Sequence, residues 1–548
     1  MDYQLTIPAI MRRVETLSAD VEVVSRRGNR AIERYTYADM VRRAKQLAVA
    51  LQDLGVRPGD RVGTLAWNHH RHLEAYFAVP AIGAILHTLN LRLHPKELAT
   101  IANHAGDRFL IVDSCLLPLL ERFRPQLNVE AIIVMDDDGT VPDYAIDYDG
   151  LLARSDASRF VYPEPDEHDA AAMCYTSGTT GQSKGVLYSH RSIVLQSMHW
   201  TAADGFGLCR RDVVLSVVPM FHINGWGMAF TAAMVGAKLV LPGEFLDPSS
   251  VLDLIHAERV TVSAGVPTVW LGVLQALEKD HVHDVASLRT IIIGGSAVPE
   301  ALLRGYDRLS IRVVQAWGMT EMAAVGTVSL LPPHLDDAPL DDRYRARARQ
   351  GAALPFVEIR ARGENGLVPW DGESMGELEV RGPTVASQYY DNAAATECFT
   401  DDGWFRTGDI VTIDRQGSIE IKDRSKDLIK SGGEWISSVA LENALMGHPA
   451  IAEAAVVGVP DAKWDERPLA CIVVKPGCEA SVDELRSHLA ADFPKWWIPD
   501  AFEFIDAIPR TSTGKFLKSA LRERYRGRRD TRATAHSPIP SLTTGELD

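Results

Sequence analysis

The segment 175–185, YTSGTTGQSKG, brings hydroxyl side chains, small residues and one lysine together within a few positions. It follows a short apolar run, and its small residues let backbone amides come close to an anion. Lys184 comes three residues after the second glycine, so the spacing differs from the GxxxxGK[ST] loop of nucleotide triphosphatases. A flexible linker is the alternative, but so tight a cluster of lysine and hydroxyl groups favours a phosphate-binding loop.

Seven further motifs follow this loop along the chain. They are PMFHINGW (219–226), GGSAVP (294–299), QAWGMTE (315–321), GELEVRGP (376–383), GWFRTGD (403–409), DRSKDLIKSGGEW (423–435) and PRTSTGK (509–515). In type and order, the loop and these motifs resemble the signature of the adenylate-forming superfamily, which contains acyl-CoA synthetases, luciferases and non-ribosomal adenylation domains. Each motif alone is weak, but their shared order over nearly the whole chain makes coincidence a poor explanation.

The resemblance implies an ATP-dependent acid:CoA ligase. Such an enzyme activates a carboxylic acid as an acyl adenylate, passes the acyl group to coenzyme A, and releases AMP and pyrophosphate. ATP, Mg2+ and coenzyme A are therefore the expected cofactors, and a small carboxylic acid is the expected partner.

Several motif residues are expected to hold the triphosphate and its metal ion. A polyanion needs hydroxyl, amide and ammonium donors. The resemblance assigns these donors to Thr176, Ser177, Gly178, Thr179, Thr180 and Lys184. It also makes Glu321 the Mg2+ ligand and Thr320 a contact of the α-phosphate. A solvated carboxylate at a helix start is the alternative for Glu321.

A second group of residues is expected to hold the nucleoside. By resemblance, Asp409 accepts the ribose hydroxyls with Arg424 beside it, and Trp317 stacks on adenine in place of the more usual tyrosine. Core packing is the alternative for Trp317. The other expected nucleotide-binding residues are Gly295, Ser296, Ala297, Gln315 and Gly318.

Lys515 lies in a loop rich in serine, threonine and glycine, where an isolated lysine is ordinarily a solvated charge. In the family, this position is the catalytic lysine of adenylation. A cation that spans the carboxylate nucleophile and the α-phosphate orients the attack and stabilises charge on the phosphoryl oxygens. No general base is needed, because the acid is already ionised at neutral pH.

The second half-reaction requires coenzyme A to reach the acyl carbonyl, and family members rotate the carboxy-terminal domain to allow it. The resemblance puts the hinge at Lys426. Rotation brings residues 430–435 towards the adenylate, so the residues expected to bind coenzyme A are Lys430, Gly432, Gly433 and Trp435. An ordinary turn is the alternative for the two glycines.

The acyl pocket is expected beside PMFHINGW. The resemblance assigns His222 to the carboxylate end and Trp226 to the tunnel, and Gly294 and Gly318 complete the expected substrate-binding set. Because Phe221 and its neighbours are uncharged, a plain acid is favoured over an amino acid. The chain looks most like bacterial medium- and long-chain fatty-acid:CoA ligases and methylmercaptopropionate:CoA ligases. We therefore expect a fatty acid of short to medium length, with methylmercaptopropionate as the alternative.

Three other functions stay open. An adenylation domain that loads a carrier protein would normally adjoin a carrier segment, and we see none after residue 526. A luciferase-like oxygenase would need O2 in place of coenzyme A. A non-catalytic nucleotide-binding regulator predicts an eroded site, whereas all the expected charged groups are present. A metal site at His69, His70 and His72 is disfavoured, because these histidines lack partnered cysteines or carboxylates.

The elements that must position these residues predict an α/β fold. Helical patterns alternate with short apolar runs over 35–127 and again over 213–328, which indicates two α/β subdomains. Short alternating strands over 352–422 predict a small β subdomain, and a smaller, mobile α+β domain follows. The expected boundaries are 1–424, 425–530 with the hinge near Lys426, and a disordered tail over 531–548.

Composition excludes some classes of function. The formal net charge of -16 opposes non-specific binding of nucleic acid, so small molecules are the expected partners. Six cysteines are scattered without metal-ligand spacing, and no apolar run suits a signal peptide or a membrane span. These features favour a cytoplasmic enzyme, and analogy suggests a homodimer.

Overall fold

The computed structural model describes residues 2–137, 139, 141–176, 183–279, 282–392, 397–432, 434–461, 463–510 and 516–526. These residues divide into two compact units. The first runs to Ser425, and the second runs from Lys426 to Pro509 and resumes at Phe516. The predicted α/β class is confirmed. The predicted domain boundaries and the hinge stay predictions, and the expected tail lies outside the described residues.

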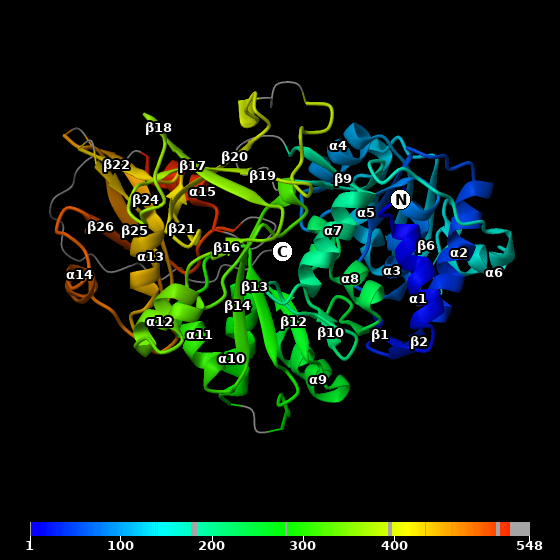
Figure 1. Cartoon of the computed structure of the whole chain (residues 1–548), viewed down its shortest axis with the longest axis horizontal. Helices are drawn as coiled ribbons and strands as arrows, with labels where there is room; N and C mark the ends of the chain where they lie inside the picture. Colours follow the sequence, from blue (N-terminus) through cyan, green and yellow to red (C-terminus); the bar gives the residue numbers. More distant parts are fainter. Residues whose placement is uncertain are drawn as a thin grey trace, which may run out of the picture. The chain divides into compact units, whose positions relative to one another are not determined.

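The first unit contains a mixed sheet in the order β7-β6-β5-β3-β4-β8-β9. Its strands β6 and β9 are labelled in Figure 1. Its strands are β3 (Arg61–Leu65), β4 (Ile85–Thr88), β5 (Asp107–Asp113), β6 (Ala131–Met135), β7 (Ile146–Asp147), β8 (Ala170–Tyr175) and β9 (Gly185–Ser189). The strands run parallel except for the antiparallel pair β8 and β9. Since β8 ends at Tyr175 and β9 begins at Gly185, the predicted phosphate loop connects these two strands.

A second sheet in this unit has the order β16-β15-β14-β13-β12-β10-β11-β1-β2. Its strands are β1 (Glu22–Arg26), β2 (Ile32–Thr36), β10 (Val213–Ser216), β11 (Lys238–Leu241), β12 (Val262–Gly265), β13 (Thr290–Gly294), β14 (Arg312–Trp317), β15 (Thr327–Val328) and β16 (Ala352–Ala353). Strand β1 pairs in parallel with β11, with Val24 opposite Val240. The amino-terminal strands therefore belong to the second sheet, although the first sheet follows them in sequence.

Helices of the first unit cover these sheets. They are α1 (Ile7–Leu17), α2 (Tyr37–Asp53), α3 (His70–Ala81), α4 (Pro95–Ala105), α5 (Leu117–Glu121), α6 (Tyr148–Ala153), α7 (His190–Thr201), α8 (Met228–Val235), α9 (Pro248–Glu258), α10 (Pro267–Leu277), α11 (Glu300–Asp307) and α12 (Leu340–Arg347). Helices α1, α2, α3, α7 and α8 contact one another, so the two sheets share one large apolar core. In the part of the chain that the structure describes, no helix has the length and apolar composition needed to cross a bilayer.

An antiparallel sheet, β18-β17-β19-β20-β21, forms the predicted β subdomain. Its strands are β17 (Glu358–Gly363), β18 (Gly366–Leu367), β19 (Gly376–Arg381), β20 (Phe405–Ile413) and β21 (Ile419–Arg424). The prediction began this subdomain at residue 352, but β16 pairs with β15 of the second sheet instead. Short alternating strands look alike in sequence whichever sheet they join, which explains the difference.

The second unit pairs a long hairpin with three helices. Its strands are β22 (Ile429–Ser431), β23 (Glu434–Ile436), β24 (Ile451–Asp461), β25 (Asp465–Val474) and β26 (Ala501–Phe504), and its helices are α13 (Ser438–Met446), α14 (Val482–Ala490) and α15 (Lys518–Tyr525). Apolar side chains of β24 and β25 alternate between two clusters. One cluster lies against α13 and α14, and the other lies against α15. This unit thus has a core of its own.

The three histidines at the start of α3 have separate hydrogen-bond partners. His69 Nε2 lies 2.6 Å from Asp113 Oδ1, and His70 Nδ1 lies 3.2 Å from Ser25 Oγ. His72 contacts the carbonyl of Trp67 and the hydroxyl of Thr64. Within the described ranges, no three His, Cys, Asp or Glu side chains come together as a metal-holding group.

Two buried histidines make the first unit sensitive to acid. Burial lowers the pKa of His72 and of His190 to about 4, from an ordinary value of 6.5. Between about pH 4 and pH 6.5, these two histidines therefore bind protons more readily in the unfolded chain than in the folded chain. The contribution of the two neutral histidines to the free energy of unfolding is fully present above about pH 6.5 and is lost as the pH falls towards 4.

We predict that the midpoint temperature of thermal unfolding falls less between pH 6.5 and pH 4.5 for His190→Asn than for the wild type. The asparagine oxygen can still accept the hydrogen bond that His190 Nδ1 receives from the Ile7 N–H. Scanning fluorimetry measures the midpoints, and exposed His168→Asn serves as the control. An equal fall of the unfolding temperature in the wild type and in His190→Asn would show that His190 does not cause the acid sensitivity.

Candidate active site

A hollow of about 510 Å3 opens in the first unit. Predicted site residues that line it are Thr176, Lys184, His222, Trp226, Gly294, Gly295, Trp317, Gly318, Thr320, Glu321 and Arg424. The structure thus brings together residues from the phosphate loop, the acyl motif and the end of β21. Ser177, Gly178, Thr179, Thr180, Gly433 and Lys515 lie outside the described residues.

Four residues of the first unit that are predicted to bind the nucleotide do not line the hollow themselves. Asp409 is buried behind it and contacts two residues that do line it. Gln315 is buried on β14, and its side-chain oxygen accepts the Val298 N–H at 3.3 Å. Ser296 is exposed and Ala297 is half-buried. Gln315 therefore holds the 294–299 loop in place, and its part in nucleotide binding stays a prediction.

The base of the phosphate loop is closed by hydrogen bonds between its two ends. The Thr176 N–H donates to the Lys184 carbonyl at 2.9 Å, and the Lys184 N–H donates to Thr176 Oγ1 at 3.0 Å. These bonds continue the β8–β9 pairing by one step. They fix where the lysine side chain leaves the backbone.

Tyr389 joins that lysine to the predicted metal ligand. Lys184 Nζ lies 4.6 Å from the centre of the Tyr389 ring, within the range of a cation–π interaction. The Tyr389 hydroxyl donates to Glu321 Oε1 at 2.6 Å. Burial and the nearby carboxylate raise the pKa of Tyr389 well above its ordinary value, so the hydroxyl keeps its proton.

The 386–390 segment makes two backbone contacts on either side of this tyrosine. The Ala386 N–H donates to the Glu321 carbonyl at 2.7 Å, and the Tyr390 N–H donates to the Gly185 carbonyl at 2.8 Å. The segment therefore spans from the phosphate loop to the motif that ends in Glu321. Gln388 lies within this segment and leaves both contacts in place.

A buried carboxylate organises the other end of the hollow. Asp409 Oδ2 accepts a hydrogen bond from Trp317 Nε1 at 2.9 Å, and Asp409 Oδ1 pairs with Arg424 Nε at 2.8 Å. A carboxylate offers about four lone-pair sites, so two remain for further donors. The indole bond lies in the ring plane, which fixes the ring and leaves its faces for stacking.

Two glycines are required where the backbone crowds the hollow. A Cβ added at Gly318 would lie 1.7 Å from the Ala324 carbonyl oxygen. At Gly294 it would lie 2.8 Å from the Ala316 carbonyl oxygen and 3.1 Å from the Trp226 ring. A Cβ at either position would overlap a carbonyl oxygen unless the backbone moved. Any larger residue would therefore disturb the strand ends that carry Trp317.

The acyl motif forms a strained turn, η4 (Ile223–Gly227), with His222 at its start. Ile223, Asn224 and Trp226 have φ values of 38°, 33° and 55°, which non-glycine residues rarely adopt. The segment before the turn is held by a residue outside every predicted motif. The side chain of Asn68 donates to the carbonyls of Ser216 and Val218 and accepts the N–H of Met220.

Tyr389, Asn68 and Arg406 are site residues that the sequence reasoning did not select. Arg406 lies inside GWFRTGD and lines the hollow, so its charge within that motif was an available signal. Tyr389 lies in none of the motifs, and its partner Glu321 is 68 residues away in sequence. No local pattern marks Asn68.

The donor set at Glu321 fits Mg2+. Carboxylate oxygen is a preferred ligand of this ion, which often binds through one or two carboxylates together with substrate phosphates. Glu321 lines the hollow, and the bond from Tyr389 to one of its oxygens holds the carboxylate in place.

The predicted CoA-binding residues lie in the second unit, at the β22–β23 hairpin. Lys430 and Trp435 are cross-strand partners, with Lys430 Nζ 5.6 Å from the indole ring. Gly432 has a φ of 63°, and a Cβ there would lie 2.7 Å from the Trp464 ring. Lys430, Gly432, Trp435 and Lys426 are all exposed.

Two family models together match most of the chain. The model of the AMP-binding enzymes matches residues 12–390, and the model of the AMP-binding enzyme C-terminal domain matches residues 440–515. The chain belongs to the AMP-binding enzyme family.

Individual members of this family are similar to this chain over nearly its whole length. A long-chain-fatty-acid–CoA ligase of Thermus thermophilus is 48% identical over 96% of each chain. A 3-methylmercaptopropionyl-CoA ligase of Ruegeria pomeroyi is 42% identical over 96% of this chain and 98% of its own. Among solved structures, the anthranilate CoA ligase AuaEII in complex with anthranoyl-AMP has a TM-score of 0.85 and 27% identity, covering 95% of this chain and 98% of that one.

We predict that Tyr389→Phe lowers the rate of AMP release roughly tenfold or more and raises the Mg2+ concentration needed for half the maximal rate. Removing a group that orients a metal-binding carboxylate typically costs this much. Calorimetric titration with a non-hydrolysable ATP analogue should show weaker binding with Mg2+ and unchanged binding in EDTA.

Tyr390→Phe is the matched control, because it removes a hydroxyl from the adjacent residue and keeps that residue's backbone contact with Gly185. This control should behave like the wild type. An unchanged Mg2+ dependence in Tyr389→Phe would show that the tyrosine only packs.

Proposed function

We propose that this chain activates a fatty acid of short to medium length, with methylmercaptopropionate as the alternative substrate. The enzyme class is that of the AMP-forming acyl-CoA synthetases, which use ATP and coenzyme A. The observation that carries the proposal is the hollow of about 510 Å3, where cationic, carboxylate and aromatic groups converge beside the acyl motif.

In the first half-reaction, a carboxylate oxygen of the acid attacks the α-phosphorus of ATP. The bond to the bridging oxygen of the β-phosphate breaks, and pyrophosphate leaves. Lys184 and Thr176 would hold the phosphates together with the hydroxyl and amide groups of residues 177–180. Arg406 would add a further cation, and a polyanion is stabilised by each fixed positive charge.

The nucleoside would bind with its adenine on a face of Trp317 and its ribose at Asp409. Two ribose hydroxyls can use the remaining lone pairs of Asp409, while the ion pair with Arg424 keeps that carboxylate oriented. Gly295, Ser296 and Ala297 would form the opposite wall, and Gly318 leaves room for the adenine at the strand end. This arrangement fixes the α-phosphate relative to the acid.

Glu321 would hold Mg2+, and Thr320 would contact the α-phosphate. Mg2+, when bound, neutralises phosphate charge during the attack. Tyr389 would keep the Glu321 carboxylate in one orientation before the substrates bind, which reduces the reorganisation required in the reaction.

The acid would lie beside His222 and Trp226, with Gly294 and Gly318 at its sides. The hollow must hold both the nucleotide and the acid, and the Trp226 ring packs so close to Gly294 that a Cβ added there would lie 3.1 Å from it. A hollow of about 510 Å3 that must hold both molecules supports a short or medium acyl chain.

In the second half-reaction, the thiol sulfur of coenzyme A attacks the acyl carbonyl, loses its proton to solvent, and AMP leaves. Rotation at Lys426 would withdraw Lys515 and bring Lys430, Gly432, Gly433 and Trp435 towards the adenylate. A homodimeric state and a cytoplasmic location also remain proposals.

We predict CoA-dependent AMP release from Mg-ATP with straight-chain acids, with a maximum at a short or medium chain. The assay covers C2 to C16 acids, methylmercaptopropionate and benzoate, each with and without coenzyme A. A maximum at methylmercaptopropionate selects the alternative substrate. Adenylate that accumulates independently of coenzyme A rejects the ligase and favours a carrier-loading enzyme or an oxygenase.

We predict that Lys515→Ala lowers adenylate formation by roughly 10²–10³-fold, as loss of one fixed donor at a reacting centre typically does. Conversion of a supplied acyl adenylate to acyl-CoA should stay close to the wild-type rate. The control is Lys495→Ala, which removes an exposed lysine. Equal loss of both half-reactions contradicts this division of labour.

A further inference from the structure

Helix α4 contacts both ends of the predicted phosphate loop. Glu97, in the first turn of the helix, accepts a hydrogen bond from the Ser183 hydroxyl at 2.7 Å. His104, in the last turn, shares a hydrogen bond with the Tyr175 hydroxyl, which lies 2.6 Å from His104 Nδ1. Side chains at this spacing lie on one face of a helix, so a single face of α4 reaches both ends of the loop.

The two hydrogen-bond partners stand directly before the two residues that close the loop. Tyr175 precedes Thr176, and Ser183 precedes Lys184. Thr176 and Lys184 are joined by two hydrogen bonds, and both line the large hollow. A shift of Tyr175 or Ser183 would therefore move the groups that face the hollow.

The helix is a firm support for these contacts. Leu98, Ile101 and Ala102 on α4 are buried in an apolar cluster of the first unit. The helix starts with Pro95 in its first turn and ends at Gly106, whose φ is 69°. Both residues are typical of well-defined helix ends. Because a packed core resists displacement, the polar side chains of α4 keep fixed positions.

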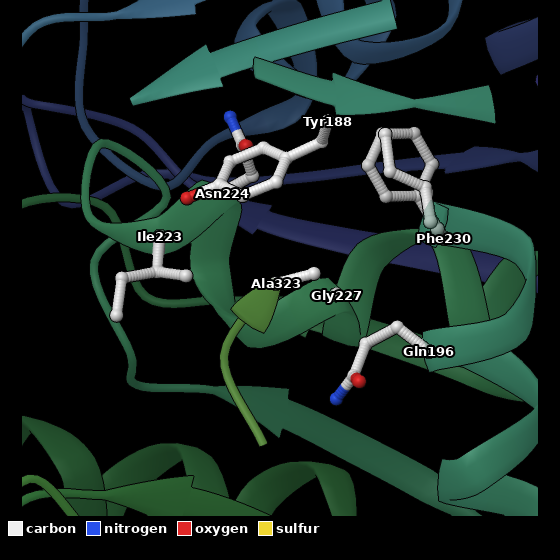
Figure 2. A pocket seen from close by; sticks show the side chains of 8 residues that line it. Tyr188, Gln196, Ile223, Asn224, Gly227, Phe230 and Ala323 are labelled. Carbon is white, nitrogen blue, oxygen red and sulfur yellow. The ribbon is translucent and has the colours of Figure 1, made fainter. Parts of the chain in front are cut away.

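Strand β9, which begins directly after Lys184, is held further along by a different contact. The Tyr188 hydroxyl donates to the Thr320 carbonyl at 2.7 Å. Figure 2 shows this tyrosine at a small cavity behind the acyl motif. The strand is thus anchored beyond the loop, while the contact from α4 acts on the residue just before Lys184.

A role within the helix alone is the alternative for Glu97 and His104. An acidic residue in the first turn and a basic residue in the last turn both complement the helix dipole. That role needs no particular partner, whereas these side chains make short hydrogen bonds to residues 86 and 71 positions away. The His104 ring also meets the Tyr390 ring edge-on, with 5.8 Å between the ring centres.

We propose that Glu97 and His104 are positioning residues for adenylation, which hold the two ends of the phosphate loop so that Thr176 and Lys184 present their donors to the β- and γ-phosphates of ATP. Neither of the two is among the residues that line the large hollow, so they act through their hydrogen-bond partners. The inference rests on the proposed function, because it takes Thr176 and Lys184 as ligands of the triphosphate.

ATP and AMP distinguish this role from a general effect on the fold. AMP has no β- or γ-phosphate, so its binding would depend on the nucleoside end of the hollow, at Trp317 and Asp409. A displaced loop would weaken the binding of a triphosphate and spare that of AMP. Damage to the fold would weaken both.

We expect Glu97→Ala to weaken the binding of a non-hydrolysable ATP analogue by about tenfold or more, because a small displacement of a binding group can cost up to about 10²-fold. AMP binding, and conversion of a supplied acyl adenylate to acyl-CoA, should stay at wild-type levels. Glu97→Gln keeps an oxygen that accepts the Ser183 hydroxyl, so it should restore tight binding. Calorimetric titration measures both nucleotides, and exposed Glu278→Ala is the matched control.

The other contact gives a parallel test. His104→Leu should weaken binding of the ATP analogue and spare AMP, while His104→Asn should restore it, since an amide can pair with a hydroxyl as donor or acceptor. Ser183→Ala removes the Glu97 bond from its other side. The double variant Glu97→Ala/Ser183→Ala should therefore bind the analogue no more weakly than Glu97→Ala.

The outcomes separate the two proposals. Equal weakening of the ATP analogue and AMP overturns the inference, as does a Glu97→Gln enzyme that binds the analogue as weakly as Glu97→Ala. Wild-type binding in Ser183→Ala also overturns it, even if Glu97→Ala fails to fold. A wild type that binds the ATP analogue but gives no CoA-dependent AMP release with any acid tested rejects the proposed function instead.

Discussion

The hydrogen bond between Trp317 Nε1 and Asp409 Oδ2 connects the end of β14 to β20, and so links the second large sheet to the β subdomain. Burying a carboxylate is costly unless it is paired, and Arg424 on β21 pairs with its other oxygen. One buried group thereby holds an aromatic ring and a guanidinium in fixed positions at the edge of the hollow. The geometry of the nucleotide end depends on this group remaining in place.

A comparable link exists at the phosphate end, where the 386–390 segment contacts Gly185 and Glu321. The two links involve different subdomains, yet both bring polar groups to one hollow. The polar groups that would contact one small molecule are thus held by strands and segments that are far apart in sequence. Such preorganisation means that little rearrangement is required within the first unit when charge develops.

Much of this site could be predicted from sequence, because each motif keeps its functional residues within a few positions of one another. The loop at 175–185 and the position of Trp317 are examples. The bond from Trp317 to Asp409 was not predictable, since its two ends are 92 residues apart. Asn68 was missed for a similar reason: an isolated amide has no local pattern, and only the packed chain shows what it contacts. The placement of β1 and β2 in the second sheet was missed because strand composition does not specify a distant partner.

That placement has a consequence for how the protein is made. Strand β1 is among the first segments to leave the ribosome, but its parallel partner β11 follows roughly 200 residues later. At synthesis rates of about 5–20 residues per second, the delay is on the order of 10–40 s. During that interval Val23 and Val24 of β1 lack their β11 neighbours, so the nascent chain is exposed to aggregation and to binding by chaperones. The second sheet is completed only late in translation, and its assembly is therefore sensitive to the pace of synthesis.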